Sequence, residues 1–223
     1  MYQLFVSGGV MGLFLQVVPI ACLVGFIYAV YRCMRIKIQR LSVVWGNEIV
    51  RWLFVCYLTG LINLTLVPSN LWSNIWAQIY LGYSQSEITF FSGGFNFVPT
   101  IIKVLSGEFT FGSWMKTMLV GNLLMFIPMG FFLVFVHPKI HSKDILKVAV
   151  IIPVTVEIIQ PIVGRSFDVD DLILNFIGIM IGYFAAACIK TLIGKKDKET
   201  GQYDESPKIS SKQNLQQQQR DSD

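Results

Sequence analysis

The sequence predicts an all-α, polytopic transmembrane helix bundle that crosses the bilayer about five times. Apolar residues make up 53% of the 223 residues and charged residues only 14%, whereas a soluble domain carries about 25% charged residues. Five apolar runs are each long enough to cross the hydrocarbon core as a helix, which takes about 20 residues. No run shows the strict alternation of a transmembrane β-strand, so helices are expected to satisfy the backbone within the bilayer.

The five runs are separated by polar or aromatic segments, and three of them end at a helix-breaking residue. Pro68 closes the second run, Pro138 the third and Gly164 the fourth. The first run lacks the positively charged flank of a signal peptide, so it is expected to remain as a helix. The predicted spans are about 10–31, 49–67, 117–136, 145–163 and 172–193.

The distribution of basic residues predicts the orientation of these spans. Of the 18 Lys and Arg residues, all but Lys103, Lys116 and Arg165 fall around the ends that follow the first, third and fifth runs. Because cytoplasmic loops carry an excess of Lys and Arg, we expect the N-terminus outside and the C-terminus in the cytoplasm. The expected location of the protein is the cell membrane. The basic residues form no groove-lining patch, so nucleic acid is not an expected partner.

Composition divides the chain into three predicted regions. Residues 1–48 would hold an extra N-terminal span and a basic cytoplasmic loop, and residues 49–193 the main transmembrane domain. Residues 194–223 are polar and rich in Gln, so they are expected to be a disordered cytoplasmic tail. The outer segment 68–116 is aromatic, which favours the membrane interface. Within it, residues 97–105 could form either a short interfacial helix or a loop folded over the helix ends.

Polar side chains cluster near the predicted outer ends of the last three spans. Glu157 is the most informative of them, because a charged side chain within a span is costly and is a functional candidate by default. Gln160 follows three residues later and shares its helix face. Asn122 and Asn175 lie at a similar depth on the neighbouring spans, as estimated from the helical rise. Several polar groups at one depth are more than helix packing usually needs.

The short outer turn before the last run adds charges of both signs over the same helix ends. It carries Arg165, Asp168, Asp170 and Asp171. Arg165 could clamp a phosphate or carboxylate through its planar fork, and the aspartates could hold a hard cation such as Mg²⁺. Glu157 is the best candidate in this group for proton transfer or hydrogen bonding.

Structural readings of the same residues stay open. Glu157 could be a protonated carboxyl, or a partner of Arg165, that only holds helices together. The two asparagines could be interhelical hydrogen-bond donors, Asp171 could serve only as the N-cap of the last span, and the other two aspartates could be solvated. Gly178 and Gly182 form a small-xxx-small pair that lets another helix approach closely.

These residues fall within segments that resemble the signatures of the VanZ-like family. The resemblance extends over residues 53–186. The matching segments are 95–99 (FNFVP), 122–131 (NLLMFIPMGF), 157–160 (EIIQ), 164–178 (GRSFDVDDLILNFIG) and 182–183 (GY). Thr100 and Phe176 depart from the family pattern, which has an aromatic residue and a Thr there, and this departure concerns substrate preference.

The resemblance implies a multi-pass membrane protein of Gram-positive bacteria whose named relative lowers susceptibility to teicoplanin. Carried over by position, it gives two groups of site residues. The candidate catalytic residues are Glu157, Arg165, Asp168 and Asp171, and the candidate binding residues are Asn96, Asn122, Gln160, Asp170 and Asn175.

The sequence as a whole favours a VanZ-like envelope protein that lowers susceptibility to glycopeptide or lipoglycopeptide antibiotics. Its outer-leaflet polar site would act on or bind an envelope component. The alternatives are a small transporter or lipid-moving protein, and a non-catalytic membrane scaffold. Whether the protein is an enzyme stays open. The expected partners are membrane lipids and either a lipid-linked envelope substrate or a lipoglycopeptide. The sequence identifies no cofactor beyond the Mg²⁺ that the aspartates could hold.

Overall fold

The computed structural model describes residues 10–40, 42–68, 71–82, 87, 89–106 and 112–193. Among them, five helices are long and apolar enough to cross a membrane, which confirms the predicted all-α transmembrane fold. They are α2 (Val10–Gln39), α3 (Trp45–Leu66), α6 (Ser113–Val136), α7 (Ser142–Ile159) and a last helix, Val169–Ile193. The tail predicted to be disordered, 194–223, lies outside the described residues.

Contacts along the chain define two compact units. The first, Met1–Phe184, contains α2 to α7 and most of the last helix. In the second, Ala185–Asp223, the described residues continue that helix as far as Ile193. Everything that positions the candidate site belongs to the first unit.

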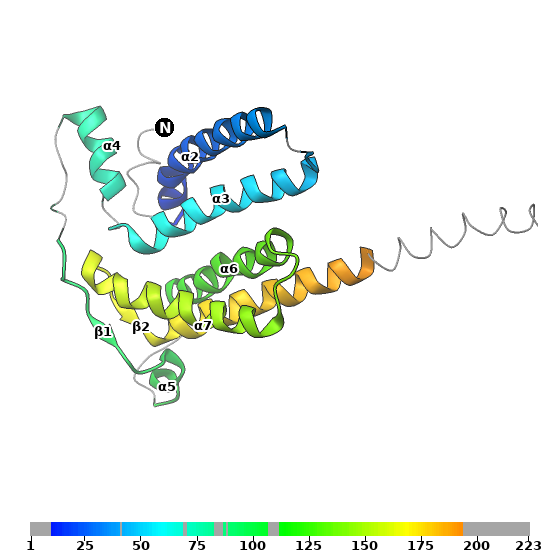
Figure 1. Cartoon of the computed structure of the whole chain (residues 1–223). Coiled ribbons are helices and arrows are strands. Elements are labelled where there is room, and N and C mark those ends of the chain that lie inside the picture. The colour runs from blue at the N-terminus through cyan, green and yellow to red at the C-terminus, as the bar shows by residue number, and fades with distance from the viewer. Residues whose placement is uncertain are drawn as a thin grey trace, which may run out of the picture. The chain divides into compact units, whose positions relative to one another are not determined.

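Helices α2 and α3 form an antiparallel hairpin (Figure 1). The indole Nε1 of Trp52 donates to the carbonyl of Gly25 at 2.8 Å. A Cβ added to Gly25 would collide with Sγ of Cys56, so glycine permits the close approach of the two helices. At 30 residues, α2 is about 45 Å long and exceeds the roughly 30 Å hydrocarbon core. Its basic end therefore extends beyond the predicted run.

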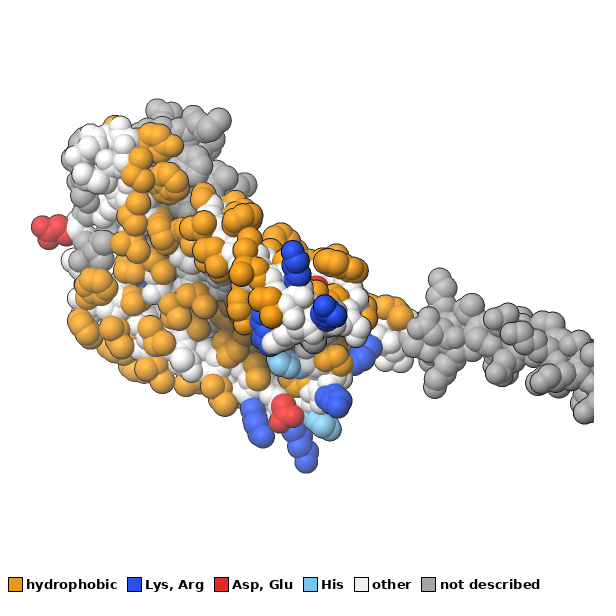
Figure 2. Space-filling view, turned by 45° about the horizontal axis from the view of Figure 1, so that its top comes forward, with side chains coloured by type: hydrophobic (Ala, Val, Ile, Leu, Met, Phe, Trp, Pro, Cys, Tyr) orange, Lys and Arg blue, Asp and Glu red, His pale blue; other side chains and the backbone are white. Residues whose placement is uncertain are grey.

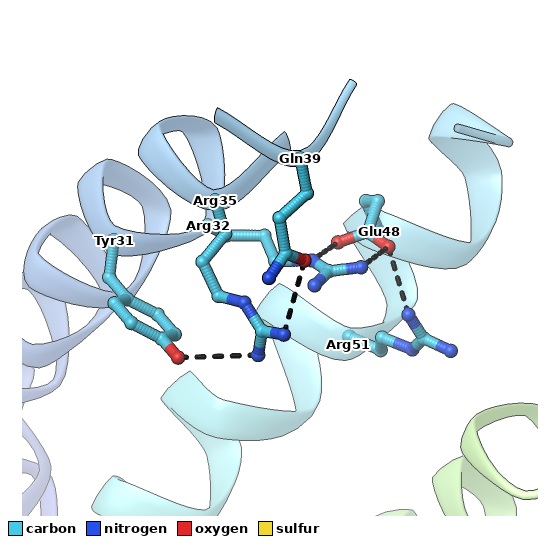
Figure 3. Close-up of polar contacts among 6 residues, drawn as sticks. All are labelled: Tyr31, Arg32, Arg35, Gln39, Glu48 and Arg51. Atoms are coloured by element: carbon cyan, nitrogen blue, oxygen red, sulfur yellow. Dashed lines mark hydrogen bonds and ion pairs between the residues drawn. The ribbon is translucent and has the colours of Figure 1, made fainter. Parts of the chain in front are cut away.

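An ion-pair cluster joins the predicted inner ends of α2 and α3 (Figure 3). The guanidinium of Arg32 contacts both carboxylate oxygens of Glu48, at 2.5 and 2.8 Å. Arg51 donates to the same carboxylate at 2.9 Å. Arg35 contacts Tyr31 and Gln39 on its own helix. The bidentate pair fixes the hairpin where the chain reverses direction.

The last helix packs against α6 through glycines on both sides. A Cβ added to Gly130 would collide with the carbonyl of Ile179, and one added to Gly182 with the carbonyl of Ile127. Gly178 is similarly close to Leu123. The small-xxx-small pair therefore faces α6, and backbone contact replaces side-chain packing there.

The buried core lies between α3, α6, α7 and the last helix. Its fully or almost fully buried side chains are Leu61, Phe126, Met129, Leu133, Ile145, Ala149, Val156 and Ile179. Many large apolar side chains on the spans remain exposed, as expected for surfaces that face lipid. Figure 2 shows hydrophobic side chains covering much of one face, with Lys, Arg and His gathered at one end of it.

Three short elements occupy the segment between α3 and α6. Helix α4 (Leu71–Leu81) was not predicted from the sequence. Strand β1 (Phe95–Asn96) pairs in parallel with β2 (Phe167–Asp168), with Asn96 opposite Asp168. Helix α5 (Thr100–Leu105) follows, so residues 97–105 contain a helix and not only a loop.

The chain tightens and turns before the last helix begins. Helix α7 continues through Pro153 and passes into a 3₁₀ turn, η1 (Gln160–Val163), which includes Pro161. Gly164 ends the turn with φ of +78°, a left-handed conformation that favours glycine. The last helix then starts at Val169, three residues before the predicted position.

Candidate functional site

A polar cavity of about 330 Å³ lies where β1, α5, α6 and the turn before the last helix meet. Most of the residues that line it carry charged or amide side chains, and the charges are of both signs. The lining residues are Asn96, Thr100, Lys103, Met118, Leu119, Asn122, Arg165, Asp168, Asp170 and Asp171. We refer to this set as the polar cavity.

Asp168 organises the wall of the polar cavity. One carboxylate oxygen accepts from the backbone N–H of Asp170 at 2.9 Å, and the other accepts from Nδ2 of Asn96 at 3.0 Å. The residue directly precedes the last helix, so the first of these bonds is an N-cap contact. The parallel pairing of β1 with β2 brings Asn96 to this position from 72 residues away.

The expectation that Asp171 is the N-cap is therefore wrong. Because the helix starts at Val169, Asp171 lies within its first turn and Asp168 takes the capping position. The carboxylate of Asp171 instead accepts from Nδ2 of Asn122 on α6. This contact joins two spans at the rim of the cavity.

Helix α5 is held against the same wall by two contacts. The backbone N–H of Thr100, at the start of α5, donates to Oδ2 of Asp170 at 2.8 Å. Lys103 donates from Nζ to Oδ1 of Asn96 at 2.6 Å. Asn96 thus connects a cation to the capping carboxylate of Asp168.

Glu157 lies behind the cavity wall and does not line it. Its side chain has no exposed surface, and Oε2 accepts from the backbone N–H of Asp168 at 2.9 Å. With its NH₂ turned toward the surrounding acceptors, Gln160 donates to the two Glu157 oxygens at 3.1 and 3.2 Å and to the Ser166 carbonyl at 3.2 Å. The opposite orientation would face the amide oxygen of Gln160 toward a carboxylate, which is unfavourable.

Arg165 stands at the edge of the polar cavity. Its Nη1 donates to the backbone carbonyl of Leu64 on α3 at 3.0 Å, and it forms no ion pair with any carboxylate in the described part of the chain. Burial lowers the pKa of the guanidinium, and the nearby carboxylates of Asp171 and Glu157 act in the opposite direction. An arginine has five N–H donors, so most of them remain available to a ligand.

Asn175 lies one turn below Asp171 and is 2% exposed. Its Oδ1 has no hydrogen-bond donor among the described residues. Like Gln160, Asn175 does not line the polar cavity, whereas the other three predicted binding residues, Asn96, Asn122 and Asp170, do.

The arrangement of the carboxylate oxygens in the polar cavity does not favour a metal-ion site. Within the described ranges, no three His, Cys, Asp or Glu side chains converge as metal ligands would. Both oxygens of Asp168, and one each of Asp170 and Asp171, already accept from N–H donors. The described residues of the polar cavity therefore fit Mg²⁺ poorly.

Six of the nine predicted site residues line one cavity. They are Asn96, Asn122, Arg165, Asp168, Asp170 and Asp171. Thr100, Lys103 and Leu64 were not predicted as site residues. For Lys103 a signal existed, since it is one of only three basic residues on the predicted outer side. For Leu64 no side-chain signal exists, because its contribution is a backbone carbonyl.

The chain is similar to a known protein family over most of its transmembrane part. The VanZ/LLP1 family model matches residues 54–190, a range that contains α6, α7, the last helix up to Lys190 and every residue of the polar cavity. Helix α2 lies outside it. No curated protein and no solved structure matches the chain. The chain therefore belongs to the VanZ/LLP1 family of multi-pass membrane proteins, a family linked to antibiotic resistance.

Proposed function

We propose that this protein lowers the susceptibility of Gram-positive cells to glycopeptide antibiotics of the teicoplanin type. It would do so in the cell membrane, by binding or altering an envelope component at its predicted outer side. The observation that carries the proposal is the polar cavity, whose lining combines the basic residues Arg165 and Lys103 with Asp168, Asp170 and Asp171.

The polar cavity supports ligand binding because some hydrogen-bond donors and carboxylate oxygens in its lining have no partner among the described residues. Arg165 uses a single N–H for Leu64, and Lys103 uses one contact to Asn96. Asp170 and Asp171 each engage one carboxylate oxygen. Partly buried charges usually have partners, so this arrangement fits a polar ligand better than a closed structural network.

Glu157 supports the site without touching the cavity. Its carboxylate accepts a hydrogen bond from the backbone N–H of Asp168. The carboxylate of Asp168 in turn accepts from the amide of Asn96 and caps the last helix. We therefore assign Glu157 and Gln160 as positioning residues. The groups that would meet the ligand are Arg165 and the carboxylates of the cavity.

The experiment is expression in a susceptible Gram-positive host, with the inhibitory concentration of teicoplanin and the membrane abundance of the protein both measured. The wild type should raise the inhibitory concentration. Arg165→Lys keeps the charge but loses the fork, and Asp171→Asn keeps an acceptor for Asn122 but loses the charge. Both should bring the inhibitory concentration down toward that of cells with an empty vector while the protein remains abundant. Arg35→Gln, on α2 and remote from the cavity, is the matched control and should retain the effect.

Two outcomes would contradict the proposal. If the wild type gives no shift in inhibitory concentration, the protein does not act on susceptibility. If activity and abundance fall in parallel in the Arg165 and Asp171 variants, the polar network only locks helices together, as the scaffold alternative predicts.

A further inference from the structure

An apolar groove of about 760 Å³ runs along α2, α3 and α6 beside the polar cavity. Its lining is almost entirely hydrocarbon. The hydroxyl of Tyr57 donates a hydrogen bond to the carbonyl of Met125 at 2.9 Å. The lining residues are Val17, Val18, Ala21, Tyr57, Gly60, Leu61, Leu64, Thr117, Val120, Gly121, Leu124, Met125 and Pro128. We refer to this set as the apolar groove.

The apolar groove adjoins the polar cavity. Both use α6 as a wall, on adjacent faces: Gly121 lines the groove and Asn122, the next residue, lines the cavity. Arg165 connects them directly, because it lines the cavity and donates to the carbonyl of the groove residue Leu64. The polar end of the combined site lies at the helix ends, and the apolar part lies within the spans.

A polar cavity at the helix ends beside an apolar groove within the spans is complementary to an amphiphile in one membrane leaflet, with its headgroup in the cavity and its tail in the groove. A cavity of about 330 Å³ holds a headgroup but not a whole lipid, whereas the groove is large enough for an acyl chain. Acyl chains gain little from leaving surrounding lipid for an apolar protein surface. Selectivity must therefore come from the headgroup.

The charges of the polar cavity select the class of headgroup. Arg165 and Lys103 offer unused donors to a phosphate. Asp170 and Asp171 each keep one carboxylate oxygen without a partner among the described residues. A purely anionic headgroup would leave these carboxylates facing added negative charge, which is unfavourable. A headgroup with a phosphate and a primary amine satisfies both sets.

We propose that the polar cavity and the apolar groove together bind one phospholipid whose headgroup carries a phosphate and a primary amine, as in phosphatidylethanolamine. This inference rests on the proposed function, since it names the envelope component that the polar cavity holds. The phosphate faces Arg165 and Lys103, the amine faces Asp170 and Asp171, and one acyl chain occupies the groove.

The groove offers a direct test through two of its glycines. A Cβ added to Gly60 or Gly121 would meet no atom within 4 Å, so a larger side chain there would fill the groove without a collision at the backbone. Gly46, on the same helix as Gly60 but outside the groove, also has open space around it. Gly46→Phe is therefore the matched control for Gly60→Phe and Gly121→Phe.

The experiment is native mass spectrometry of the full-length protein in detergent, incubated with equimolar phosphatidylethanolamine, phosphatidylglycerol and phosphatidylcholine. We expect one molecule of the ethanolamine lipid bound in preference to the other two. Gly60→Phe and Gly121→Phe should weaken this binding about tenfold, and Gly46→Phe should bind as the wild type does. Thermal unfolding of each variant shows whether it is folded.

Three results would overturn the inference. One is equal binding of all three lipids, another is a preference for phosphatidylglycerol, and the third is full retention of the ethanolamine lipid by both folded groove variants. This assay does not depend on antibiotic susceptibility. Lipid selectivity without any teicoplanin effect would therefore reject the proposed function alone, and a teicoplanin effect without lipid selectivity would reject only this inference.

Discussion

The backbone N–H of Asp168 donates to the carboxylate of Glu157 at 2.9 Å, which joins the cap of the last helix to a side chain with no exposed surface. Through the two carboxylate oxygens of Asp168, this bond also sets the position of Asn96 on β1 and the first turn of the last helix. The geometry of the polar cavity thus depends on a residue that does not line it.

Replacing Glu157 should therefore reduce the stability of the protein, although Glu157 does not line the polar cavity. Glu157→Ala leaves the Asp168 N–H and the Gln160 amide without acceptors in a buried place, and we expect it to destabilise the protein by about 1–3 kcal/mol. Glu157→Gln keeps an acceptor oxygen and should be less destabilising. Thermal unfolding of the purified protein in detergent measures both. An alanine variant as stable as the wild type would show that this carboxylate does not support the fold.

The glycines of the interface between α6 and the last helix give a second prediction. Gly182→Ala places a methyl group against the Ile127 carbonyl, and we expect a loss of about 1–3 kcal/mol from overpacking. Gly121→Ala, on α6, meets open space and should be neutral or slightly stabilising, because alanine favours helices. The measurement is membrane abundance together with the unfolding temperature in detergent. Equal behaviour of the two variants would contradict the close backbone approach seen at Gly182.

The spans and the polar residues of the site could be predicted from the sequence because both depend on local signals. A bilayer requires about 20 consecutive apolar residues, and the five predicted runs all appear as helices. A charged residue within such a run, as at Glu157, stands out against that background. Boundaries were less accurate: α2 extends to Gln39, since basic residues favour helix as readily as apolar ones.

The connections between polar residues could not be predicted, because they depend on pairings distant in sequence. The bond from Asn96 to Asp168 follows from a parallel pairing of two strands of only two residues each, and strands this short leave no periodic pattern. The reason that Asp168, and not Asp171, caps the last helix is also not a local one. Any of three nearby aspartates can cap a helix, and only the actual start at Val169 decides between them.

The ion-pair cluster at the predicted inner ends of α2 and α3 gives a third prediction. Glu48→Gln removes the charge that both Arg32 and Arg51 contact, and the two guanidinium groups would then repel each other. We expect a lower unfolding temperature in detergent, with a larger loss at low salt than at high salt because screening weakens that repulsion. Arg35→Gln affects only contacts within α2 and serves as the control. A Glu48→Gln variant that unfolds at the same temperature as this control would show that the ion pairs do not fix the hairpin.

The fourth prediction concerns orientation, which the basic residues predict and on which an outer-side site depends. In a background without Cys22, Cys33, Cys56 and Cys188, single cysteines are introduced as Ser166→Cys and His141→Cys. Ser166 is itself exposed in the turn before the last helix. His141 lies between α6 and α7, and its side chain is 84% exposed. A maleimide that cannot cross the membrane should label position 166 in intact cells, and position 141 only after the cells are permeabilised.

The two positions control for each other, since an α-helical span, α7 with η1, separates them. Each must react in permeabilised cells, which shows that the thiol is accessible and the protein is present. Labelling of position 141 but not position 166 in intact cells would place Arg165 and the cavity aspartates on the cytoplasmic side. The polar cavity could then not meet an antibiotic or an outer-leaflet lipid, although the contacts within it would be unchanged.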